Sequence, residues 1–156
     1  MIRLKKNKKN VFAMVPGMRS GRCPYCGSHI ELRSSEGMYR KGRPDELLYV
    51  CSKYPACNAY VRVHPGTNRP MGSLADPALR RLRQKAHQEF NKLYQTGMMS
   101  KDQAYAWLAD ILQMPRAQAH IGHLGEYYCQ LVIDESRKAL TRYWALRQQD
   151  RGGATA

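Results

Sequence analysis

Apolar and polar residues alternate over short runs in the first half of the chain. His29 to Arg33, Leu47 to Val50 and Ala59 to Val63 are each bounded by turn residues, which is typical of short β-strands. Ser34 to Asp45 is polar and contains glycine, so we expect a loop or a wide hairpin there. Upstream, Val11 to Val15 could add a short strand or an anchor. The pattern therefore predicts a small β-rich region.

From residue 77 onward, apolar residues recur at helical spacing. Pro77 fits the first turn of a helix with Asp76 as its N-cap, and Gly97 ends this helix. Its apolar stripe consists of Leu79, Leu82, Ala86, Phe90 and Leu93, and the basic residues Arg80, Arg81, Arg83 and Lys85 fall mainly off the stripe. A second helix begins after Ser100, which forms a capping box with Gln103, and Pro115 ends it.

A third helix is predicted from about Glu126 to Arg147. The pattern places five of its apolar or aromatic side chains inward: Tyr128, Leu131, Val132, Leu140 and Trp144. Short strands followed by three helices predict an α+β fold, with a β-rich module ahead of a three-helix α domain.

Four of the five cysteines form two close pairs. Cys23 and Cys26 have C-x2-C spacing, and Cys51 and Cys57 have C-x5-C spacing after an intervening stretch long enough for two strands. Four thiolates in two turns can converge on one tetrahedral zinc ion. The β-rich module is therefore predicted to be a zinc ribbon with one structural zinc. Because four thiolates close the coordination sphere, we expect no catalytic residue at the metal.

The remaining cysteine and two histidines have simpler interpretations. Cys129 lies in an apolar helical stretch, so a buried structural thiol is favoured over a reactive one. His29 and His64 are candidate substitute ligands, but a surface or turn histidine is favoured because four cysteines already suffice. Paired cysteines used for metal, with no secretory signal and no apolar run long enough to cross a membrane, predict a cytoplasmic protein.

Positive charge is concentrated toward the N-terminus. Residues 1–22 carry seven Lys/Arg and no acidic residue, whereas residues 98–156 carry seven basic and six acidic residues. Of the net charge of +14, +13 lies in the first 97 residues. A basic footprint on one part of a chain favours a phosphate-rich partner, namely nucleic acid. The alternative is that Lys5, Lys6, Lys8 and Lys9 form a solvated tail that aids solubility.

Tyrosines are interleaved with basic residues in the ribbon. The tyrosines are Tyr25, Tyr39, Tyr49, Tyr54 and Tyr60, and the basic residues are Arg22, Arg33, Arg40, Lys41, Arg43, Lys53 and Arg62. Aromatic rings beside Lys and Arg suit stacking of unpaired bases with charge on the backbone. We expect Tyr25 and Tyr54 to stack, and Arg22, Lys53, Arg62 and the N-terminal lysines Lys5, Lys6, Lys8 and Lys9 to neutralise phosphates. The alternative is that several tyrosines form the ribbon's small core.

Two further classes of function stay open. The second and third helices could resemble a helix-turn-helix, but their near-neutral charge favours packing on each other or on a partner protein. A two-metal nuclease requires a cluster of carboxylates, and the acidic residues of the ribbon region are only Glu31, Glu36, Asp45 and Glu46. No Walker loop, dinucleotide fingerprint, Ser-His-Asp set or HExxH motif is present.

Two family resemblances arise from these motifs. Cys23-Pro-Tyr-Cys26-Gly27 and Cys51-Ser-Lys-Tyr-Pro-Ala-Cys57 resemble the zinc domains at the C-terminus of bacterial type IA topoisomerases. That resemblance implies single-stranded DNA binding for residues 20–65. The segments Cys51–Tyr60, His64–Ala75, Ala104–Leu108 and His120–Gly122 resemble a family of zinc-finger-containing proteins found mainly in phages and prophages. This second resemblance covers roughly residues 20–135 and implies no activity.

Together these observations predict four regions and one main function. The regions are a flexible basic arm (1–19), a zinc ribbon (20–72), a helical domain (73–149) and a disordered tail (150–156). The main prediction is a non-catalytic nucleic-acid-binding protein of phage or prophage type that favours single-stranded DNA. One alternative is a phage accessory factor that binds a host protein through its helical domain, and another is a nuclease or nuclease subunit.

Overall fold

The structure, a computed structural model, describes residues 10–153 of the 156-residue chain. Its elements follow in the order β1, β2, β3, α1, α2 and α3, with two short 3-10 turns between α2 and α3. A three-stranded sheet followed by three helices confirms the predicted α+β fold. The chain divides into two units, residues 1–80 and 81–156, and each is described by itself. The domain limits inferred from the sequence stay predictions.

The sheet is antiparallel, with β2 in the centre. β1 (Ile30–Ser34) pairs with β2 (Leu47–Cys51), and β2 pairs with β3 (Tyr60–Arg62). Directly opposite residues share one face of a sheet. The register therefore places Leu32, Tyr49 and Val61 in one row on the same face. All three side chains are buried in the apolar core of this unit.

Residues 11–18 pack onto this face of the sheet. The sequence was compatible with a short strand or an anchor at Val11 to Val15. The structure forms turns there. Phe12, Val15 and Met18 are buried in the same core as Tyr49. The rings of Phe12 and Tyr49 meet edge to face, with centroids 4.9 Å apart. Part of the predicted arm thus covers the sheet, whereas residues 1–9 lie outside the described residues.

The helices begin where their capping residues predict. α1 (Pro77–Gln95) starts after Asp76, whose Oδ1 accepts a hydrogen bond from the Leu79 backbone N at 2.8 Å. α2 (Lys101–Leu112) starts with a complete capping box between Ser100 and Gln103. Both predicted caps are confirmed, because each satisfies backbone N–H groups that the first helical turn leaves unpaired.

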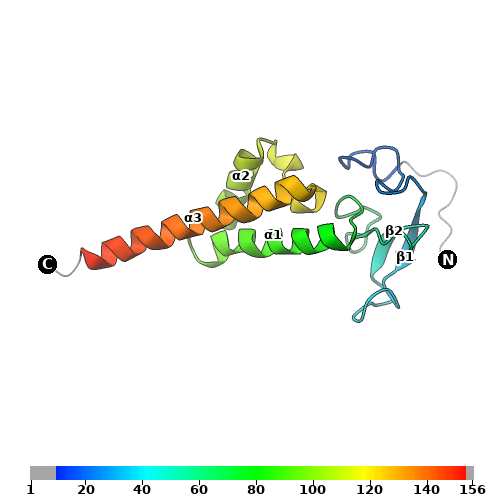
Figure 1. Cartoon of the computed structure of the whole chain (residues 1–156), viewed down its shortest axis with the longest axis horizontal. Helices are drawn as coiled ribbons and strands as arrows, with labels where there is room; N and C mark the ends of the chain where they lie inside the picture. Colours follow the sequence, from blue (N-terminus) through cyan, green and yellow to red (C-terminus); the bar gives the residue numbers. More distant parts are fainter. Residues whose placement is uncertain (1–9, 154–156) are drawn as a thin grey trace. The chain divides into compact units, whose positions relative to one another are not determined.

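The third helix, α3 (Glu126–Gly152), is longer than the apolar pattern predicts. It continues past Arg147, and its C-terminal turns, orange to red in Figure 1, extend beyond α1 and α2. The prediction that Tyr128 and Trp144 point inward is wrong, because they are 38% and 45% exposed. Apolar spacing along a helix predicts burial only where another element packs against it.

The helical unit has its own apolar core. Its buried side chains include Phe90, Leu93, Ala104, Leu108, Leu112, Ile121, Leu124, Cys129, Val132, Ile133 and Leu140. The structural interpretation of Cys129 agrees with its complete burial. Arg83, which the sequence placed off the α1 stripe, is also buried, and its Nε donates to the Leu124 carbonyl at 3.1 Å. Within residues 10–153, no helix is both long and apolar enough to cross a membrane.

Candidate metal centre and its surroundings

The four predicted ligands converge in the structure. Cys23 and Cys26 lie in the turn before β1, Cys51 ends β2, and Cys57 lies between β2 and β3. All four Sγ atoms lie within 4.8 Å of one another. The Cys23–Cys57 and Cys26–Cys51 pairs are separated by 3.7 Å and 3.4 Å. Each short separation thus joins one cysteine of the first pair to one of the second.

Backbone hydrogen bonds shape the turn of each cysteine pair. In the first turn, the Gly27 N–H donates to the Cys23 carbonyl at 2.9 Å, and Gly27 has φ +74°. A positive φ favours glycine, which explains glycine directly after the first pair. In the second turn, the Cys57 N–H donates to the Lys53 carbonyl at 3.1 Å. Each turn thus folds back on itself and directs its own pair of cysteines toward the other pair.

The donor set fits zinc. Tetrahedral zinc with Zn–S bonds of about 2.3 Å holds its sulfur ligands about 3.8 Å apart. The two Sγ separations of 3.7 and 3.4 Å come close to that spacing. A disulfide would need about 2.05 Å, and all five cysteines are free thiols. The four cysteines can therefore hold one zinc ion. That ion would link the turn before β1 to the end of β2.

The surroundings shift the pKa values of three of the thiols in different directions. Hydrogen bonds from the Ser28 side chain and backbone lower the pKa of Cys26 to about 6. Burial raises the pKa of Cys51 and of Cys57. Metal binding requires deprotonated thiols, so zinc would offset the cost of ionising Cys51 and Cys57, whose pKa values are raised. With four sulfur ligands the centre is closed, and its contribution is to hold the fold.

Two of the predicted nucleic-acid residues lie in the first cysteine turn. Arg22 is exposed, and its Nη1 donates to the Gly27 carbonyl at 3.2 Å. Tyr25 is 45% exposed, and its hydroxyl accepts a hydrogen bond from the Asp76 backbone N at 3.0 Å. Both side chains are therefore accessible at the metal centre, although each also makes a local contact.

The other predicted residues are placed in three different ways. Lys53 is exposed in the second cysteine turn, and Tyr54 beside it is half-buried. Arg62 leaves β3 with 59% of its side chain exposed, and its Nε lies 3.1 Å from Glu46 Oε1. The sequence offered no sign of that ion pair. Lys5, Lys6, Lys8 and Lys9 lie outside the described residues, so their role stays a prediction.

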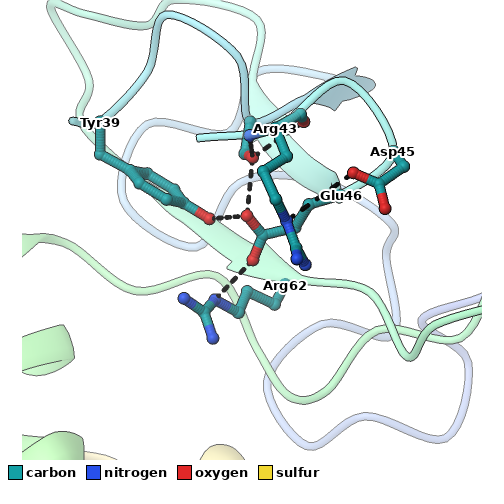
Figure 2. Close-up of polar contacts among 6 residues, drawn as sticks. Tyr39, Arg43, Asp45, Glu46 and Arg62 are labelled. Carbon is teal, nitrogen blue, oxygen red and sulfur yellow. Dashed lines mark hydrogen bonds and ion pairs between the residues drawn. The ribbon is translucent and has the colours of Figure 1, made fainter. Parts of the chain in front are cut away.

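Glu46 is the centre of a polar network that the sequence analysis did not identify (Figure 2). Its carboxylate accepts hydrogen bonds from the Tyr39 hydroxyl and from Ser35 Oγ, the latter at 2.7 Å. These two hydrogen bonds, the Tyr39 bond first, hold the pKa of Glu46 below its usual value. Gly42 allows the loop to close, since a Cβ there would lie 2.0 Å from the Ser35 carbonyl oxygen.

The remaining candidate ligands are not gathered at a metal site. Across residues 10–153, the four cysteines are the one set of three or more His, Cys, Asp or Glu side chains close enough to share an ion. His29 is exposed and lies 3.5 Å from Glu31, while Asp45 lies 3.7 Å from Arg43. His64 is exposed in a turn in which its N–H donates to the Arg69 carbonyl. Neither histidine replaces a cysteine.

The comparisons with known proteins agree with the metal centre. Comparison with curated proteins and with solved structures found no match. A family model described as a zinc-finger-containing domain matches residues 19–139, which include all four cysteines, the sheet, α1 and α2. This match confirms the resemblance to zinc-finger-containing proteins, whereas the topoisomerase resemblance stays a prediction. The chain therefore belongs to this zinc-finger-containing family.

Proposed function

We propose that the protein binds nucleic acid without cleaving it, through the surface of its zinc ribbon, and that single-stranded DNA is the favoured ligand. In this proposal zinc holds the two cysteine turns in place. Tyr25 and Tyr54 offer aromatic faces to bases, and Arg22, Lys53 and Arg62 neutralise phosphates. The lysines Lys5, Lys6, Lys8 and Lys9 would extend the contact along the backbone of the strand.

The observation that carries this proposal is the state of the basic side chains around the metal centre. Within the described part of the chain, Arg33 and Lys53 are exposed and form no ion pair. Arg22 is exposed and is hydrogen-bonded only to a carbonyl among the contacts described. Cations without an acidic partner beside aromatic rings, here the exposed Tyr25 and the half-buried Tyr54, are the combination that single-strand-binding surfaces use.

The proposal is tested by fluorescence anisotropy of the zinc-loaded protein with labelled single- and double-stranded DNA and RNA across a salt series. Release of counterions from about three to five phosphates predicts a slope of log K against log salt of about −2 to −4 for a single strand. An affinity that does not change between low and moderate salt would contradict the proposal. The same samples, incubated with Mg²⁺ or Mn²⁺, test for cleavage, and intact oligonucleotides are expected.

A second candidate function is binding of a protein partner by the helical unit, as in a phage factor that acts on a host protein in the cytoplasm. The observation that favours it is the set of exposed large apolar side chains on α3: Tyr127, Tyr128, Trp144 and Leu146. Exposed aromatic residues are enriched at protein interfaces. Recovery of one stoichiometric host protein by the purified chain, together with no nucleic-acid binding, would favour this alternative.

A further inference from the structure

The second face of the sheet carries a different set of side chains from the core face. The register places Arg33, Leu48 and Arg62 in one row across the three strands. The next row consists of Glu31, Val50 and Tyr60. Leu48 and Val50 are fully buried in the central strand, whereas Arg33 and Arg62 are exposed on the outer strands. This face therefore combines a buried apolar centre with an arginine at each edge of one row, and the next row has the acidic Glu31 on β1 and Tyr60 on β3.

Two tyrosines from other segments join Tyr60 on this face. Tyr39, from the loop between β1 and β2, stacks against Tyr60 with ring centroids 6.5 Å apart and planes 26° apart. Tyr54, from the second cysteine turn, meets Tyr60 edge to face at 6.4 Å. All three rings are half-buried. We call Tyr39, Tyr54 and Tyr60 the tyrosine face.

The three rings differ in how closely another side chain of the protein covers their faces. The Arg80 guanidinium carbon lies 3.7 Å from the centroid of the Tyr60 ring. Arg80 also donates to the carbonyls of Asn58 and Ala75, so it acts as a fixed structural cover for Tyr60. Tyr39 has no guanidinium cover among the described contacts, and Tyr54 has only a looser one, from Arg33, whose guanidinium carbon lies 5.8 Å from the centroid of its ring. They are therefore the rings available for a further stacking partner.

Basic side chains lie beside the tyrosine face. The Arg33 guanidinium carbon lies 5.8 Å from the centroid of the Tyr54 ring, and Arg33 forms no ion pair within residues 10–153. Arg62 keeps 59% of its side chain exposed while its Nε contacts Glu46. Exposed guanidinium groups next to aromatic rings can bind phosphates while bases occupy the rings.

A hydrogen-bond network and the candidate metal centre hold Tyr39 and Tyr54, respectively, in position. The Tyr39 hydroxyl donates to Glu46, which also accepts from Ser35, so the loop is tied to the start of β2 (Figure 2). Tyr54 lies between Cys51 and Cys57, so a zinc ion held by the four cysteines would fix its segment. Rings that are ordered before binding lose less conformational entropy when a base stacks on them.

We infer that the tyrosine face, with Arg33 and Arg62 at its edges, is the surface on which unpaired bases of a single-stranded nucleic acid stack. This inference rests on the proposed function and extends the base contacts from the second cysteine turn, where Tyr54 lies, onto the second face of the sheet. Tyr39 and Arg33 then contact the ligand, in addition to Tyr54 and Arg62. Base stacking is largely independent of sequence, so the ligand class is an unstructured single strand.

The test compares an oligothymidylate with an abasic strand of the same length, which keeps the phosphates and lacks the bases. Wild-type zinc-loaded protein is expected to bind the oligothymidylate at least about fivefold more tightly than the abasic strand. Tyr39→Leu removes one of the two available rings, so it is expected to reduce that preference by at least about threefold and leave abasic-strand binding within about twofold of wild type. Arg33→Gln is expected to weaken binding of both strands and reduce the salt slope by about one phosphate.

Matched variants separate this surface from a general loss of fold. Tyr39→Phe loses the hydroxyl but keeps the ring, so it should keep the base preference. Tyr127→Leu removes a 74% exposed tyrosine from α3, and Arg142→Gln removes an exposed arginine from the same helix, so both should bind as wild type does. Each variant is compared at equal zinc content and equal helical circular dichroism.

The outcomes distinguish the inference from the proposed function. If wild-type protein binds neither strand, the proposed function fails and the inference fails with it. If wild-type protein prefers the oligothymidylate and Tyr39→Leu keeps that preference in full, the inference is wrong while nucleic-acid binding stands. A reduced preference in Tyr39→Leu but not in Tyr39→Phe or Tyr127→Leu supports stacking on the tyrosine face.

Discussion

The ribbon and the helical unit are stabilised in different ways. The ribbon has strands of three to five residues, and two of its four metal ligands, Cys23 and Cys51, are themselves part of its apolar core. The helical unit is built on helices of 12 to 27 residues around an apolar core that contains no metal ligand. Zinc would therefore add to an apolar core in the ribbon, whereas the helical unit depends on apolar packing without a metal. Each unit can therefore be disrupted without the other.

The largest expected effect is loss of the ribbon when its metal is removed. Structural zinc contributes about 10–16 kcal/mol in zinc-finger peptides, more than a small sheet can supply by packing. Cys51→Ala, or treatment with a chelator, should therefore unfold the sheet and leave α1–α3 helical. Amide hydrogen exchange resolved by residue measures this directly. Protection should be lost at Tyr49 and Val61 and kept at Leu108.

Cys129→Ala is the matched control, because Cys129 is fully buried but lies far from the ligand set in sequence. This variant should keep one zinc per chain by native mass spectrometry and keep protection in the sheet. Equal loss of protection in both units of Cys51→Ala would show that the two units do not unfold separately. That result would contradict separate stabilisation of the ribbon and the helical unit.

The next largest effect is the loss of stability of the helical unit in Phe90→Ala. Phe90 is fully buried, and its ring meets Tyr105 edge to face with centroids 5.1 Å apart. Truncating a buried phenylalanine costs about 3–5 kcal/mol. The variant should lose much of its helical circular dichroism on mild heating and still bind one zinc. A zinc content that falls together with helicity would contradict independent stabilisation.

The parts of the structure that depend on local spacing could be predicted from the sequence. The ligands Cys23, Cys26, Cys51 and Cys57 and the caps at Asp76 and Ser100 depend on residues a few positions apart, and the structure contains each of them. Local spacing dictates turns and helix starts, so these features needed no tertiary information.

Features that depend on tertiary packing could not be predicted. The Arg62–Glu46 ion pair requires the cross-strand register, and the burial of Arg83 requires the Leu124 carbonyl to lie beside it. Trp144 continues the apolar spacing of α3, yet it is 45% exposed. The C-terminal turns of α3 extend beyond α1 and α2, so apolar spacing there has no partner to pack against (Figure 1). The network around Glu46 joins a loop residue, Tyr39, to the start of a strand, which no periodic pattern encodes.

A smaller effect is expected from Glu46→Gln within the ribbon. The substitution removes a charged acceptor from the Tyr39 and Ser35 hydroxyls and the partner of Arg62, which should cost about 1–3 kcal/mol at neutral pH. The pKa of Glu46 is lower in the folded protein than its ordinary value. Its carboxylate therefore stabilises the fold at neutral pH, and this stabilisation is lost as the pH falls through the folded pKa.

The measurement is urea denaturation of wild type and Glu46→Gln from neutral to acidic pH. Protonation of the zinc ligands affects both proteins, so the difference between them isolates Glu46. That difference should shrink with acidification. A difference that stays constant with pH would show that the carboxylate charge is not what stabilises the loop.

The smallest effect is expected at the start of α2. Ser100→Ala removes the hydroxyl that accepts from the Gln103 N–H at 3.1 Å, and loss of an N-cap costs about 1 kcal/mol. Thermal unfolding of the helical unit should shift slightly while zinc content stays unchanged. Thr141→Ala, an exposed position inside α3, is the control and should cause no loss of stability.

The most direct test of the central claim is the affinity of the full chain for an oligothymidylate with and without zinc across a salt series. The zinc-loaded protein should bind with an affinity that falls steeply as salt rises. The zinc-stripped protein should bind more weakly at every salt concentration, because Tyr54 and Lys53 lose their fixed positions. Equal affinity of the two forms would contradict the claim that the folded zinc ribbon is the nucleic-acid-binding surface.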